Sequence, residues 1–71
     1  MIKFRIEQQN GRVFLLKAIL MNKLHPQYNL WYKRKGLWRR WHFVCTVEDQ
    51  NYIEQIIYFH FGFTSVVRRI S

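Results

Sequence analysis

The chain has 71 residues, a net charge of +8, and three Trp, four Tyr and six Phe residues. This length allows one domain that buries about 60% of its unfolded surface, and the aromatic content excludes intrinsic disorder, so we expect a single domain over residues 1–71. The single cysteine excludes an intramolecular disulfide, and no apolar run approaches the roughly 20 residues that cross a bilayer. We therefore expect a cytoplasmic domain with no membrane span and an anionic partner.

The first part of the chain predicts a β-hairpin. Residues 2–7 alternate between apolar and charged side chains, which is the pattern of a strand with one buried face. Asn10-Gly11 follows between two apolar segments and predicts a tight turn, because both residues tolerate positive φ. The second strand is expected from Arg12 to about Leu20.

The position of Lys17 favours one loop length for this hairpin. A two-residue loop would place Lys17 opposite Phe4 on the buried face. A three-residue loop with Gly11 as a bulge turns Lys17 outward beside Arg5 instead. In this preferred register the buried residues Ile6, Phe4 and Ile2 lie opposite Leu16, Ala18 and Leu20.

The next segment leaves one alternative open. Residues 13–24 contain Leu, Lys, Ala and Met, which are good helix formers, so a helix is the alternative to the second strand. The Asn-Gly turn signal favours the strand. Residues 22–29 contain Pro26 and few apolar side chains, so we expect a loop there.

Residues 30–47 are the most aromatic and basic part of the chain, and they predict two strands joined by a turn at Lys35-Gly36. Strict alternation gives the second of these strands an inner and an outer face. The inner face is expected to hold Trp41, Phe43, Cys45 and Val47. The outer, basic face is expected to hold Arg40, His42, Val44 and Thr46.

One helix and a last strand complete the predicted fold. The helix is expected to begin near Asp49, since acidic residues suit its positive end, and to end at Gly62 with a left-handed cap. Residues 63–70 are rich in β-branched side chains and predict a closing strand. The expected class is α+β, a small antiparallel sheet of about four to five strands in the order β-β-β-β-α-β, with the C-terminal helix packed on one face. Its inner stripe is expected to hold Ile53, Ile56, Ile57, His60 and Phe61.

The titratable residues do not predict an enzyme. Glu48 and Asp49 are adjacent and suit a helix start, while the other two acids lie far apart in sequence. Cys45 and His42 are three residues apart on a strand and are therefore expected on opposite faces. The three His residues are scattered and lack cysteine partners at zinc-binding spacing, and the three Gly residues stand alone. We expect a non-enzymatic protein without a metal or cofactor.

Residues 31–42 interleave aromatic and cationic side chains. Lys and Arg neutralise phosphates and release counterions, and exposed aromatic rings stack on unpaired bases, so this hairpin is predicted to bind DNA or RNA. The alternative is a solvated basic hairpin whose Trp side chains belong to the core. Membrane-surface peptides share the composition, but they are mostly amphipathic helices. The predicted contact residues are Trp31, Lys33, Arg34, Lys35, Trp38, Arg39, Arg40 and His42, extended by Arg68 and Arg69.

Three features together resemble the small orphan accessory proteins of tailed bacteriophages: the Asn10-Gly11 hairpin, the aromatic and basic residues 37–44, and a late helix that ends in Phe61-Gly62-Phe63. The resemblance extends over the whole chain and carries over no catalytic or binding motif. It implies a partner among host or defence components, as for anti-CRISPR proteins, and a location in the host cytoplasm. The second hypothesis is therefore an inhibitor or adaptor that docks on an acidic patch of a host protein. Imitation of DNA is excluded, because it requires an acidic surface.

Overall fold

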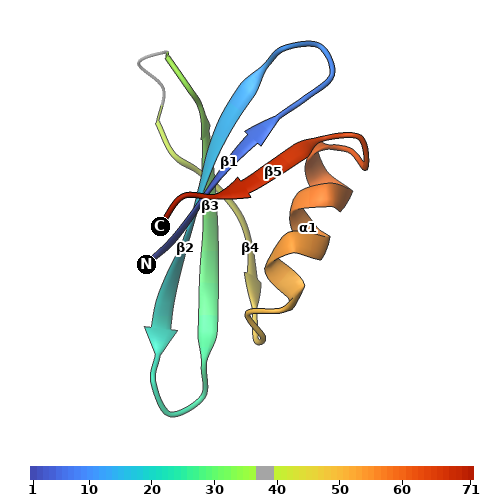
Figure 1. The fold of residues 1–71 in the computed structure, drawn as a ribbon. Helices are drawn as coiled ribbons and strands as arrows, with labels where there is room; N and C mark the ends of the chain where they lie inside the picture. Colours follow the sequence, from blue (N-terminus) through green and yellow to red (C-terminus); the bar gives the residue numbers. More distant parts are fainter. Residues whose placement is uncertain (37–39) are drawn as a thin grey trace.

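The computed structural model describes residues 1–36 and 40–71 and confirms the α+β class (Figure 1). Its elements follow the predicted order of four strands, a helix and a last strand. The antiparallel sheet has the spatial order β4-β3-β2-β1-β5. The elements are β1 (Ile2–Glu7), β2 (Val13–Asn22), β3 (Gln27–Arg34), β4 (His42–Val47), α1 (Tyr52–Phe61) and β5 (Val66–Arg69).

The helix covers one face of the sheet on its way from one edge strand, β4, to the other, β5 (Figure 1). The two termini lie side by side, because the Lys3 carbonyl accepts hydrogen bonds from the amides of Ile70 (2.8 Å) and Ser71 (3.4 Å). We call the side of the sheet that packs on α1 the helix face and the other side the open face.

The hydrophobic core lies between the helix face and α1. Alternate residues of each strand point into it, and α1 contributes Ile53, Ile57 and Phe61 at helical spacing. His60, predicted on the same inner stripe, is exposed, although its ring contacts that of Tyr32 at a centroid distance of 5.3 Å. The other buried members of the core are Ile2, Phe4, Ile6, Leu16, Ala18, Leu30 and Val47.

The first hairpin has the predicted three-residue loop but a different pairing of strands. Gly11 adopts a φ of +84°, and its amide donates to the Gln8 carbonyl at 3.0 Å. The predicted opposition of Ile6 to Leu16 was wrong by two residues, because the loop comprises residues 9–11, between Gln8 and Arg12, and not residues 10–12 as that register requires. A shift of two preserves the faces, so Lys17 points outward as predicted, opposite Lys3 and not beside Arg5. The observed core pairs are Ile6 with Phe14, Phe4 with Leu16, and Ile2 with Ala18.

The predicted loop over residues 22–29 is shorter in the structure. Strand β2 continues to Asn22, only residues 23–26 form the turn, and β3 begins at Gln27. The Asn22 side-chain oxygen accepts hydrogen bonds from the amides of Leu24 (3.0 Å) and His25 (3.4 Å). This local bonding closes the turn, so the polar residues after it are free to pair as a strand. The helical alternative for residues 13–24 is not observed.

A bulge in β4 overturns the predicted alternation of that strand. Leu30 pairs with Cys45, whereas the next residue of β3, Trp31, pairs with Phe43, so Val44 is the extra residue. Cys45 and Val47 lie on the helix face as predicted. Phe43 was wrongly assigned to the inner face, because the extra residue reverses every position that precedes it.

The predicted start near Asp49 was wrong by three residues, because α1 begins at Tyr52 with Asn51 as its N-cap residue and no side-chain cap, and Asp49 lies in the turn that precedes it. The Asp49 side chain accepts a hydrogen bond from the Asn51 amide (2.9 Å), and its carbonyl accepts one from the Tyr52 amide (3.0 Å). Gly62 ends the helix with a φ of 108° and a ψ of 146°, so it has positive φ without the predicted left-handed helical conformation. The Phe61 carbonyl at this end accepts hydrogen bonds from Gln8 Nε2 and Ser65 Oγ, both at 3.0 Å.

Candidate functional site

The open face of the sheet gathers cations from four strands. Strand register places Lys3 and Arg5 of β1, Lys17 of β2, Lys33 of β3 and Arg68 of β5 on this face. None of them comes from a loop. Side chains on regular strands are held at fixed spacing by the backbone ladder, so these charges form a patterned surface with defined positions.

Two rows of paired residues cross the sheet on the open face. In one row Lys3, Lys17, Trp31 and Phe43 lie opposite one another on successive strands, from β1 to β4. In the other row Arg68, Arg5, Leu15 and Lys33 do the same, from β5 to β3. Four of the five cations thus lie over β5, β1 and β2, with Lys33 on β3, while two aromatic rings occupy β3 and β4.

Both rows contain a direct pair of like charges. Lys3 is the register partner of Lys17, and Arg5 is the register partner of Arg68. Like charges directly opposite on one face of an antiparallel pair are destabilising, by a few tenths to about 1 kcal/mol. Repulsion between these pairs therefore lowers the stability of the sheet on each side of β1, although the hydrophobic core does not depend on these side chains.

Trp41 lies against the middle of the open face. The Nζ atoms of Lys17 and Lys33 lie 4.3 Å and 5.0 Å from the centroid of its ring. These are cation–π contacts, and they hold the ring over β2 and β3. Trp41 was predicted to point inward, and that assignment was wrong for the same reason as for Phe43, the extra residue at Val44.

A second aromatic pair completes the surface. The rings of Trp31 and Phe43 meet edge to face at a centroid distance of 5.2 Å and an interplanar angle of 69°. Phe43 is 51% exposed and Trp31 is half-buried. Neither residue belongs to the core, so both rings can contact a partner.

Acidic side chains are almost excluded from this surface. Within residues 1–36 and 40–71, Glu7 is the one acid on it, and its Oε2 lies 3.3 Å from Arg5 Nη1 in a partly exposed ion pair. The other three acids, Glu48, Asp49 and Glu54, lie in the connection from β4 to α1 or on α1 itself. Three of the four acids therefore lie away from the open face.

The structure divides the residues that were predicted as contacts. Trp31, Lys33 and Arg68 lie on the open face. Lys35 lies in the turn after β3, and Arg40 is exposed in the segment before β4. Trp38 and Arg39 lie outside the described residues. Three predicted contacts, Arg34, His42 and Arg69, share the helix face with their register partners Phe14, Tyr32 and Phe4.

His42, expected on the basic face, instead joins an aromatic cluster at the edge of the core. Its ring lies 5.4 Å from that of Tyr32, which is also 5.3 Å from His60 and 5.5 Å from Phe61. These contacts account for both imidazoles as packing groups. Nearby in sequence, Cys45 is half-buried, and burial raises the pKa of its thiol above the ordinary value, which disfavours the nucleophilic thiolate at neutral pH.

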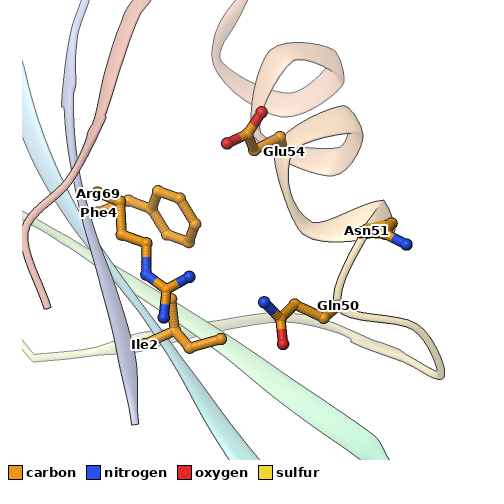
Figure 2. A pocket seen from close by; sticks show the side chains of 6 residues that line it. All are labelled: Ile2, Phe4, Gln50, Asn51, Glu54 and Arg69. Atoms are coloured by element: carbon orange, nitrogen blue, oxygen red, sulfur yellow. The ribbon is translucent and has the colours of Figure 1, made fainter.

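Arg69 lines a small pocket on the helix face, between the start of α1 and the strands β1 and β5. The pocket has a volume of about 200 Å³. Figure 2 shows the Arg69 guanidinium beside Phe4 and Ile2 and directed toward Gln50, with Glu54 on the helix above. Arg69 Nε donates to the Ser71 carbonyl at 3.1 Å, which ties this side chain to the end of the chain. The polar groups of this pocket are the Glu54 carboxylate, the Gln50 and Asn51 amides and the Arg69 guanidinium. These groups do not form the pair of a general acid and a general base that proton-transfer catalysis uses.

Metal-binding and membrane-spanning features are not found in the part of the chain that the structure describes. Within residues 1–36 and 40–71, no three His, Cys, Asp or Glu side chains gather closely enough to hold a metal ion. Over the same residues, no helix has both the length and the apolarity that crossing a bilayer requires. No family model, curated protein or solved structure is significantly similar to this chain.

The residues that sequence reasoning missed are Lys3, Arg5, Lys17, Phe43 and Trp41. A signal for the first three was present, because the alternation of β1 sends Lys3 and Arg5 to one side and the hairpin turns Lys17 to the same side. The two aromatic residues depend on the bulge at Val44. Their segment contains no glycine or proline that would mark a bulge.

Proposed function

We propose that this protein binds nucleic acid without catalysis, through phosphate contacts made by the cations of the open face. The observation that carries the proposal is the gathering of Lys3, Arg5, Lys17, Lys33 and Arg68 on one solvent-facing side of the sheet. Cationic side chains that neutralise phosphates release condensed counterions, and this release supplies most of the affinity of sequence-independent binding. The proposal moves the contact surface from the hairpin of residues 31–42 to the sheet.

The like-charge pairs support a polyanionic partner. Lys3 with Lys17, and Arg5 with Arg68, repel one another in the unbound protein. A phosphate placed between two such cations interacts favourably with both and removes the repulsion. A row of phosphates fits this arrangement better than a single acidic group, because the cations extend across four strands spaced by about 4.8 Å.

Among the residues that the structure describes, no catalytic groups converge on the same surface, which supports a binding role. Its one carboxylate, Glu7, is engaged by Arg5 at 3.3 Å. The thiol of Cys45 and the imidazoles of His42 and His60 belong to the helix face or to α1. The open face therefore offers cations and aromatic rings, which bind anions and bases.

Salt-dependent binding of labelled DNA and RNA tests the proposal. The variant Lys3→Glu/Lys33→Glu is compared with Arg12→Glu/Lys23→Glu, which changes the net charge equally at exposed residues in or beside the turns. We expect the first variant to weaken binding to every sequence and to lower the slope of log affinity against log salt by about 1.5, whereas the control changes it little. A third variant, Arg39→Glu/Arg40→Glu, measures the contribution of the hairpin. Equal effects of all three variants would show that only net charge matters and would refute the proposed surface.

An acidic host protein is the outcome to which a negative result would point. If no nucleic acid binds near physiological salt, capture from a nuclease-treated bacterial lysate tests that alternative. A protein that the unmodified chain captures in stoichiometric amount, and that Lys3→Glu/Lys33→Glu does not capture, would show that the same surface binds a protein partner.

A further inference from the structure

We infer that the open face takes a single strand of DNA or RNA, with bases stacked on Trp31 and Phe43 and phosphates on the cations of β5, β1 and β2. This inference rests on the proposed function and adds the form of the nucleic acid and its orientation. The observations behind it are the separation of rings from cations along the first row, Lys3, Lys17, Trp31 and Phe43, and the exposure of the rings.

The rings are suited to stacking and lie outside the hydrophobic core. Phe43 exposes 51% of its surface, although it pairs within the sheet, and it meets Trp31 edge to face at 5.2 Å. The edge-to-face arrangement, with the ring planes 69° apart, keeps the two rings from stacking on each other. Stacking of bases on such exposed rings removes apolar surface from water and makes the free energy of binding more favourable.

The width of the surface disfavours reading the bases of an intact duplex in the major groove. Trp31 is in a strand that pairs with both neighbours at that position, Lys17 on β2 and Phe43 on β4. The sheet there is at least three strands wide, and its full width of five strands is about 19 Å. The major groove of B-form DNA is about 12 Å wide and admits a helix or a two-stranded ribbon. The Trp31 ring therefore cannot enter the major groove with the sheet lying flat against it, whereas bases that have left a duplex can stack on it.

The order of side chains along the first row gives the orientation. Passing from β1 to β4, the first row changes from Lys3 and Lys17 to Trp31 and Phe43. Phosphates and bases are on opposite sides of a single strand, so a backbone lying along β1 and β2 directs its bases toward β3 and β4. Trp41, which lies under the Nζ atoms of Lys17 and Lys33, occupies the boundary between the two zones.

The test compares three probes with the same number of phosphates: a mixed-sequence single strand, a hairpin duplex and a single strand of abasic nucleotides. The mixed-sequence single strand is tested both as DNA and as RNA. The single strand has about 12 nucleotides, within the usual site sizes of about 4–16. Phe43→Leu is compared with Phe59→Leu, the same change at a ring that is 82% exposed on α1. Trp31→Leu is the second stacking variant, and thermal melting confirms that each variant is folded.

We expect the single strand to bind at least tenfold more tightly than the duplex or the abasic strand at equal salt. Phe43→Leu and Trp31→Leu are each expected to weaken single-strand binding about fivefold or more without changing the salt slope, and Phe59→Leu to leave it unchanged. Equal binding of the duplex, or equal effects of Phe43→Leu and Phe59→Leu, overturns the inference and leaves the proposed function standing if Lys3→Glu/Lys33→Glu still weakens binding. No binding of any probe overturns both. The DNA and RNA arms identify which polymer is preferred.

Discussion

Lys3 and Lys17 lie directly opposite one another on the open face, so Lys3→Glu is expected to stabilise the fold while it weakens nucleic-acid binding. Long side chains at opposite positions separate their charges by on the order of 7 Å, where two unit charges in water interact by about 0.6 kcal/mol. Reversal of one sign turns repulsion into attraction, a change of about 1 kcal/mol at low salt. Screening reduces the change to about half near 0.15 M salt, where the Debye length is about 8 Å.

Thermal melting at low and high salt measures this effect. A gain of about 1 kcal/mol corresponds to a rise in melting temperature of roughly 4–8 °C for a domain of this size. Lys3→Gln is expected to give about half of the rise. Lys23→Glu controls for the general fall in net charge, because Lys23 lies in the turn between β2 and β3 and outside the strand pairs. An unchanged or lower melting temperature for Lys3→Glu at low salt, or a rise that matches Lys23→Glu, would refute the reasoning.

Three further predictions concern the fold. Gly11→Ala is expected to lower the free energy of unfolding by about 1 kcal/mol, as measured by denaturant unfolding. The cause is the φ of +84° at Gly11 and not steric contact, because an added Cβ meets no atom within 4 Å. Gln8→Ala removes the hydrogen bond to the Phe61 carbonyl and is expected to cost about 0.5–1.5 kcal/mol; no loss relative to Gln9→Ala would contradict a capping role. Burial raises the pKa of Cys45, so the native thiol should alkylate more slowly than the denatured thiol at equal pH, and its contribution to stability should disappear as pH rises through the folded pKa. Equal alkylation rates would show that the thiol is not protected.

The fold was predictable where local signals agreed with one another. Alternation in residues 2–7 and the Asn10-Gly11 turn both indicated a hairpin with one buried face, and Ile53, Ile57 and Phe61 at helical spacing indicated where α1 packs. Strand ends were less predictable. The Asn22 side chain closes a turn that composition alone had extended to residue 29.

The candidate site was predictable in chemistry and less so in position. The sequence indicated that aromatic and cationic side chains act together, and two of the predicted residues, Trp31 and Lys33, lie on the open face. The assignment of Trp41 and Phe43 failed because a bulge is a property of the paired ladder, and only the partner strand reveals which residue is extra. The contribution of Arg68 likewise depends on β5 pairing with β1 across a long sequence separation.

Stability and binding are divided between the two faces of this sheet. Every buried apolar side chain of the described strands lies on the helix face, and the open-face residues are exposed or half-buried. The fold therefore tolerates like charges opposite one another on the open face, since the core that stabilises it lies on the other side. The same separation predicts how substitutions combine. Charge reversals at Lys3 and Arg68, which share no register partner, should add in their effects on the salt slope and leave the domain folded, as circular dichroism would report. Loss of structure in either variant would mean that open-face cations support the fold itself, and the assignment of this face to a polyanion would lose its physical basis.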